Sequence, residues 1–298
     1  MADSSRWERF PLRDGDIVIS TPSKCGTTWM QQIVGMLVLG RTELGSLSDL
    51  SPWLDMQIES EADVFARLAA QTHRRWIKTH TPLDGVPEHP GVTYLAVARH
   101  PLDVAMSDRD HGRNMDGARA GELRAAAVGR PDDAAAIRAA AFPDEEPATH
   151  LRWFIDNDVE PSGSGPYGLA DYCQQVGTFW ARRNEPNVHL FHYQDLWDDL
   201  EGEMRRVAAA LDIAVANERW PALVAAATLD AMRDHASDVA PNARLGLWHD
   251  DRAFFRQGGR RDWAALLSAA DIDHFHARLQ AMAGPATTWI LEGGLSPR

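Results

Sequence analysis

The chain has 298 residues, of which 44% are hydrophobic and 24% charged, so it can bury one large core and has an ordinary soluble composition. Its net charge of −13 argues against a general nucleic-acid binder but not against a small anionic ligand in a locally positive pocket. We expect a cytoplasmic protein, because no secretory signal is visible and the two cysteines have neither metal-ligand nor disulfide spacing. We expect no membrane span, because the longest apolar run, near residues 33–39, is too short to cross a bilayer. Composition gives no indication of the oligomeric state.

The first predicted elements are a strand, a loop and a helix. Residues 17–21 are apolar and β-branched, which predicts a buried strand, and large apolar residues recur at helical spacing from Thr27 to a stop at Gly40. A tight polar loop, residues 22–26, joins them. Such a loop directs backbone N–H groups and the positive end of a helix at an anion, and Lys24 adds a full charge. The sequence therefore predicts an anion site here.

Strands and helices alternate along the rest of the chain. This order predicts a single α/β domain, residues 1–298, with a parallel sheet flanked by helices on both faces. Ligands of such sheets bind at the carboxyl ends of the strands, where Lys24, His80 and Arg99 are expected. The further expected strands are 76–80, 93–99 and 188–193, and the further helices are 60–72, 101–110, 169–183, 200–211, 221–233 and 264–282.

Two stretches interrupt this pattern. Residues 112–168 are rich in Ala, Arg, Asp and Glu and read as helical pieces on loops, either an acceptor-side lid or a solvated surface excursion. Residues 237–262 read as an irregular loop dense in Arg, Gly and aromatic residues.

The lysines are unusually few. The chain has 28 Arg and two Lys, and both lysines, Lys24 and Lys78, fall in candidate site motifs. A coding bias towards Arg would explain the scarcity, but a compact ammonium at these two positions is not interchangeable with a guanidinium.

Four segments carry a family resemblance. The loop Thr21-Pro22-Ser23-Lys24-Cys25-Gly26-Thr27-Thr28-Trp29 does not match a Walker-type loop, because Lys24 precedes the glycine and the first glycine is missing. It resembles the 5′-phosphosulfate loop of the cytosolic-type sulfotransferases, Tyr-Pro-Lys-Ser-Gly-Thr-Thr-Trp, with one extra residue and Cys25 in place of serine. The other three segments are Lys78-Thr79-His80, Arg99 with Ser107, and Arg256-Gln257-Gly258 before Asp262-Trp263.

This resemblance, which covers about residues 14–265, implies a P-loop-kinase-like fold and transfer of a sulfuryl group from 3′-phosphoadenosine 5′-phosphosulfate (PAPS) to a hydroxyl of a small, largely apolar acceptor, leaving PAP. No metal is implied. His80 corresponds to the family's base, Lys78 to the residue that holds the sulfuryl oxygens, and Lys24 to the residue that stabilises the leaving phosphate oxygen. The implied donor-binding residues are Lys24, Cys25, Gly26, Thr27, Thr28, Trp29, Arg99, Ser107, Tyr193, Thr228, Leu229, Arg256, Gln257 and Gly258.

Departures from the family pattern leave alternatives open. Gln257 replaces a lysine and Arg261 a glycine, so a nucleotide-binding homologue without catalysis is one alternative, and an ATP-dependent small-molecule kinase is another. Cys25 at a helix N-terminus is either an oxidation-sensitive thiol or a small substitute for serine. We interpret four further aromatic residues as possible acceptor-pocket walls: Trp53, Trp153, Phe154 and Trp248.

Overall fold

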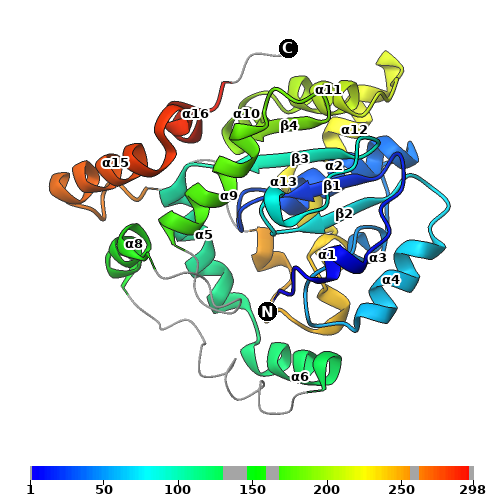
Figure 1. Cartoon of the computed structure of the whole chain (residues 1–298), viewed down its shortest axis with the longest axis horizontal. Coiled ribbons are helices and arrows are strands. Elements are labelled where there is room, and N and C mark those ends of the chain that lie inside the picture. The colour runs from blue at the N-terminus through cyan, green and yellow to red at the C-terminus, as the bar shows by residue number, and fades with distance from the viewer. Residues whose placement is uncertain (1, 130–145, 159–167, 256–261, 295–298) are drawn as a thin grey trace.

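A four-stranded parallel sheet forms the centre of the molecule. The computed structural model describes residues 2–129, 146–158, 168–255 and 262–294. The strands are β1 (Ile17–Ser20), β2 (Trp76–Thr79), β3 (Thr93–Ala98) and β4 (Val188–His192), in the order β2-β1-β3-β4 (Figure 1). The register pairs Ser20 with Thr79, so the loops that follow β1 and β2 leave the sheet side by side. The predicted α/β parallel sheet is confirmed.

Each face of the sheet is covered by its own layer of helices. Alternate strand residues enter two separate cores, as the period of a pleated strand requires: Ile77 belongs to one core, while Trp76 belongs to the other. The core that contains Ile77 includes residues of α4 (Glu61–Ala70), α5 (Pro101–Asn114), α8 (Pro147–Asp156), α9 (Leu169–Ala181), α15 (Ala269–Ala283) and α16 (Thr287–Glu292). The core that contains Trp76 includes residues of α2 (Thr27–Leu39), α3 (Leu47–Leu50), α6 (Gly117–Val128), α11 (Leu200–Ala210), α12 (Trp220–Ala226), α13 (Leu229–Asp234) and α14 (Ala236–Val239).

Most predicted elements lie within a few residues of their observed bounds, but two helices differ. The helix expected over 221–233 is two helices, α12 and α13. Thr228 ends the helical run because its backbone is extended, and its hydroxyl accepts a hydrogen bond from the Ala231 N–H as the N-cap of α13. The last helix, α15, begins five residues later than predicted, where Ser268 and Asp271 form a capping box.

The two irregular stretches are partly helical. Within 112–168, α6 and α8 confirm the expected helical pieces; residues 130–145 and 159–167 lie outside the described structure, so the lid stays a prediction. Within 237–262, α14 is followed by short 3-10 turns at Ala243–Leu245 and Arg252–Phe255. No helix among the described residues is long and apolar enough to cross a bilayer.

The close approach of α2 to β2 depends on Gly35. A Cβ atom there would lie 2.7 Å from Leu44 Cδ1 and 2.9 Å from the Trp76 ring. We predict that Gly35→Ala lowers the free energy of unfolding by roughly 1–3 kcal/mol, because both neighbours are buried and must move. Urea denaturation measures this change. Gly177→Ala in α9 is the matched control: no atom lies within 4 Å of its Cβ position, so it should stabilise by about 0.5–1 kcal/mol. Equal effects of the two changes would contradict the close packing.

Candidate active site

The loop between β1 and α2 has the backbone geometry of an anion cradle. Lys24 and Gly26 both have left-handed backbones, with φ of 64° and 97°, and Gly26 is the N-cap of α2. A Cβ on Gly26 would lie 3.0 Å from Tyr193 Cδ2, so glycine is required both for its φ and for the close approach. Thr27 and Thr28 follow as the first two residues of the helix. The N–H groups of this helix end, which have no partner within the helix, are therefore directed at the space above the loop.

Lys24 reaches from this loop to α5. Its Nζ lies 2.9 Å from His111 Nδ1 and 4.5 Å from the centre of the Phe254 ring. Because an ammonium only donates, His111 Nδ1 accepts, and the proton of the neutral imidazole is on Nε2. The His111 ring also packs against Trp248 at a centroid distance of 4.7 Å. The Lys24 ammonium thus lies against one imidazole and one phenyl ring.

Lys78 and His80 lie at the end of β2 against one indole ring. Lys78 Nζ is 4.4 Å from the centre of the Trp53 ring, and the His80 ring meets the same indole edge to face at 4.5 Å. His80 Nδ1 lies 2.7 Å from the Thr21 carbonyl oxygen. A carbonyl only accepts, so Nδ1 carries the proton and Nε2 keeps its lone pair. His80 therefore has the tautomer that a base acting through Nε2 needs.

Burial shifts the titratable groups of this site towards their neutral forms. It lowers the pKa of Lys78 to about 7, an effect that the nearby Lys24 charge increases and Asp55 opposes. Burial, with repulsion from Lys78, lowers the pKa of His80 to about 3. Burial also raises the pKa of Asp108, one turn before His111 on α5, to about 6, although Lys24 opposes this shift. His80 is consequently neutral at every working pH near 7.

Arg99 connects the end of β3 to the same loop. Its Nη1 donates to the Lys24 carbonyl oxygen at 3.3 Å, and its guanidinium lies 4.1 Å from the centre of the Tyr193 ring. The Tyr172 hydroxyl donates to the Arg99 carbonyl oxygen at 2.7 Å. These contacts place a fixed positive charge beside the anion loop.

The residues predicted to hold the adenine side are brought together. The Trp29 ring meets the Tyr193 ring at 5.3 Å, and Trp29 Nε1 donates to the Ala227 carbonyl oxygen at 2.8 Å. That bond ties α2 to the turn before α13, where Thr228 caps the helix and Leu229 packs against the core. Thr228 is thus also a capping residue, a role that its sequence motif does not indicate.

Not every predicted site residue could be placed. Arg256, Gln257 and Gly258 lie outside the described residues, and the same holds for Arg261. Ser107 lies on α5 one turn before His111. The idea that Cys25 is an oxidation-sensitive thiolate is wrong: its side chain is fully buried, and burial raises the pKa of the thiol. It is a small buried residue.

The predicted aromatic walls divide into two groups. Trp53 and Trp248 do contact site residues, but Phe154 is fully buried in the core on the face of α5 and α9, and Trp153 packs against that core.

Two polar residues of the site, His111 and Asp108, were not predicted from the sequence. Their spacing on one helix was a partial signal: His111 follows Ser107 by four residues and Asp108 by three, and residues at these spacings lie on the same face. The sequence does not show, however, that this face meets Lys24.

Comparisons with known proteins identify the family. The sulfotransferase domain model matches residues 14–285, so the chain belongs to the sulfotransferase family and is an enzyme of that class. A glycolipid sulfotransferase of Mycobacterium bovis strain BCG is 43% identical over 306 residues, covering 98% of this chain and 93% of the relative. One from Mycobacterium tuberculosis strain H37Rv is 43% identical over 302 residues, with the same coverage.

Solved structures agree on the fold. The mouse sulfotransferase SULT7A1, solved in complex with PAP, superposes with a TM-score of 0.70 at 18% identity, over 95% of this chain and 89% of that one. The kinase alternative is not favoured by any of these matches.

The low pKa of Lys78 is directly measurable. Because the chain has two lysines, labelling with 13Cε-lysine gives two signals, which Lys24→Arg assigns. We predict that the Lys78 signal titrates near pH 7, since burial and Lys24 both disfavour its charge. The folded-state pKa lies below the unfolded one, so the free energy of unfolding should rise as pH increases above about 7. A Lys78 midpoint above pH 9 would refute the burial argument.

Proposed function

We propose that this enzyme transfers the sulfuryl group of PAPS to a hydroxyl on the carbohydrate part of a glycolipid. One observation carries the proposal: Lys24, Lys78 and His80 converge at the carboxyl ends of the adjacent strands β1 and β2, beside the glycine-containing N-terminus of α2. Two cations, a helix N-terminus and a neutral base are the groups that displacement at an anionic sulfuryl centre needs.

The residues present fit a bisphosphorylated nucleotide. Gly26, Thr27 and Thr28 supply the N–H and hydroxyl groups for a 5′-phosphate, and the absence of a Cβ on Gly26 leaves room beside Tyr193. Arg99 supplies a guanidinium for the 3′-phosphate, assisted by Ser107 and by the sequence-predicted Arg256, Gln257 and Gly258. Trp29, Tyr193, Thr228 and Leu229 would surround the adenine. The PAP bound to the mouse relative supports this assignment.

Catalysis would then follow from charge and position. His80 Nε2 accepts the acceptor hydroxyl proton, because its Nδ1 proton is engaged by the Thr21 carbonyl. Lys78 donates to the sulfuryl oxygens as negative charge shifts towards the leaving group, and Lys24 donates to the leaving phosphate oxygen. Both lysines act in their protonated forms, and the anionic donor itself favours protonation of Lys78.

The acceptor side is both aromatic and polar. Trp53, Trp248 and Phe254 contribute ring surfaces, whereas Asp108 and His111 add hydrogen-bonding groups from α5. A sugar presents apolar C–H faces and many hydroxyls, so this lining suits it better than the largely apolar acceptor expected from sequence. The mycobacterial relatives named as glycolipid sulfotransferases support the same class.

The donor assignment is tested by calorimetry. We predict that PAP binds tightly without magnesium and more tightly than ATP, because Arg99 would pair with the 3′-phosphate and the two lysines and the N-terminus of α2 would supply the positive charge. Preference for ATP with magnesium would instead support a kinase, and binding of neither nucleotide would support a homologue without catalysis.

The role of His80 is tested by His80→Asn. Turnover of PAPS with a sugar acceptor should fall by roughly 10²–10⁴, because the general base is lost, while PAP affinity stays nearly unchanged. His73→Asn, at the opposite end of β2, is the control and should leave turnover unaltered. Unchanged turnover in the His80 variant would dismiss it as the base.

The role of Arg99 is tested by comparing PAP with adenosine 5′-phosphate, which lacks the 3′-phosphate. We predict that Arg99→Gln weakens PAP binding roughly 10–100-fold and the monophosphate much less, because one charge-assisted contact is removed. Arg183→Gln, which removes another guanidinium stacked on an aromatic ring (Trp180), should affect neither nucleotide. Equal losses for both nucleotides would show that Arg99 does not read the 3′-phosphate.

A further inference from the structure

A short extended segment, residues 52–54, pairs with the edge strand β2 next to the site. The Lys78 N–H donates to the Pro52 carbonyl at 3.2 Å, and the Leu54 N–H donates to the Lys78 carbonyl at 3.1 Å. This parallel pairing brings Trp53 opposite Lys78. Asp55 follows two residues later, with none of its side chain exposed.

One oxygen of Asp55 collects three hydrogen bonds. Asp55 Oδ2 accepts from Thr79 Oγ1 at 2.6 Å, from Thr81 Oγ1, and from Trp7 Nε1 at 3.1 Å. The other oxygen, Oδ1, is buried without a hydrogen-bond partner among the described residues. Burying a carboxylate in this way is costly, and three converging donors are the arrangement that stabilises its charged form.

The two threonines alternate with the proposed catalytic residues. Lys78 and His80 occupy every second position, and Thr79 and Thr81 occupy the positions between them. The Thr81 N–H also donates to Thr79 Oγ1 at 2.9 Å, and the Thr81 carbonyl accepts from Ser20 Oγ at 2.6 Å. Fixing both threonines to one carboxylate therefore fixes the backbone from which Lys78 and His80 project.

We propose that Asp55 is a positioning residue for sulfuryl transfer, which holds Lys78 and His80 in place through Thr79 and Thr81. This inference rests on the proposed function. Asp55 itself contacts neither His80 nor the anion loop through any hydrogen bond described above, so it acts through its neighbours.

The surroundings of Lys78 agree with this placement of Asp55. Burial and Lys24 lower the pKa of Lys78, and Asp55 opposes this shift. Burial also raises the pKa of Asp55, so its positioning role depends on its hydrogen bonds to Thr79 and Thr81 rather than on its charge.

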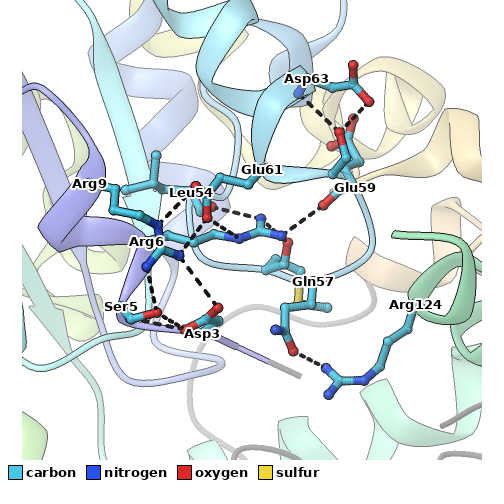
Figure 2. A network of polar contacts seen from close by, with 12 residues as sticks. Asp3, Ser5, Arg6, Arg9, Leu54, Gln57, Glu59, Glu61, Asp63 and Arg124 are labelled. Carbon is cyan, nitrogen blue, oxygen red and sulfur yellow. Dashed lines mark hydrogen bonds and ion pairs between the residues drawn. The ribbon is translucent and has the colours of Figure 1, made fainter. Parts of the chain in front are cut away.

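The N-terminal segment holds the Asp55 loop in place. Arg6, on α1 (Arg6–Arg9), donates to the carbonyl oxygens of Leu54, Met56 and Glu59 at 3.2, 3.0 and 3.1 Å, and its guanidinium lies at the centre of the network in Figure 2. The Asp3 N–H adds a bond to the Asp55 carbonyl at 2.8 Å. These hydrogen bonds hold the backbone around Asp55 in place, and a positioning group needs such support to fix its neighbours.

The test compares Asp55→Asn with wild type in turnover, PAP affinity and the pH profile. We expect turnover to fall roughly 10–100-fold, as misplacement of catalytic groups does, with PAP affinity within about twofold. The alkaline limb of turnover should move to lower pH, because Asp55 opposes the lowering of the Lys78 pKa. The titration of the Lys78 13Cε signal should move in the same direction, and this readout needs no activity.

Asp16→Asn is the matched control. Asp16 is equally buried and pairs with Arg75 just before β2, at the far end of the sheet. It should lower thermal stability without moving the pH profile. If Asp55→Asn behaves like Asp16→Asn, with lower stability but wild-type turnover and Lys78 titration, the residue is merely structural and the proposal is overturned.

Paired Val and Ser variants of Thr79 and Thr81 keep the test decisive if Asp55→Asn does not fold. Thr79→Val and Thr81→Val remove single donors at constant shape and should reduce turnover, whereas Thr79→Ser and Thr81→Ser retain the hydroxyl and should preserve it. Equal activity of the Val and Ser variants would refute the positioning role. If wild type does not transfer sulfuryl groups from PAPS at all, the proposed function fails, and the Lys78 signal of Asp55→Asn alone decides whether Asp55 positions that side chain.

Discussion

The active site depends on two ammonium groups held close to one another in a largely buried space. Lys24 and Lys78 repel each other, and each lies against an aromatic ring, Phe254 or Trp53. An aromatic face attracts a cation but does not neutralise it. An anionic ligand bound near both ammonium groups would relieve the repulsion between them, so this arrangement favours the binding of an anion.

The parallel sheet is what brings these charges together. The register between β1 and β2 ends both strands at the same level, so Lys24 and the Lys78–His80 segment leave the sheet side by side although more than fifty residues separate them. Arg99 follows β3, the strand that pairs with the other side of β1. The next helix, α5, then places His111 at hydrogen-bond distance from Lys24. The site is thus assembled at the carboxyl ends of rigid strands and completed by the N-terminus of α2 and by α5.

The sequence predicted those parts of the structure that local pattern and parallel topology determine. Apolar runs located all four strands, and the rule that ligands bind at the carboxyl strand ends placed Lys24, His80 and Arg99 together. His111, Asp108 and Asp55 could not be predicted, because their roles depend on the rotation of α5 and the path of the 52–56 segment, which are set by tertiary packing. The break at Thr228 was missed because continuous apolar spacing over 221–233 conceals a capping threonine.

The direction of the pKa shifts connects donor binding to proton uptake. Burial drives Lys78 and His80 towards neutrality in the free enzyme, but the roles proposed for the two have opposite requirements. A base must be neutral, so the shift of His80 suits its proposed role as it stands. The role proposed for Lys78 needs its charged form, and a nearby anionic donor would raise its pKa again, because opposite charges favour ionisation. In the proposed mechanism, the same burial therefore keeps His80 neutral and makes full charging of Lys78 conditional on the donor being bound.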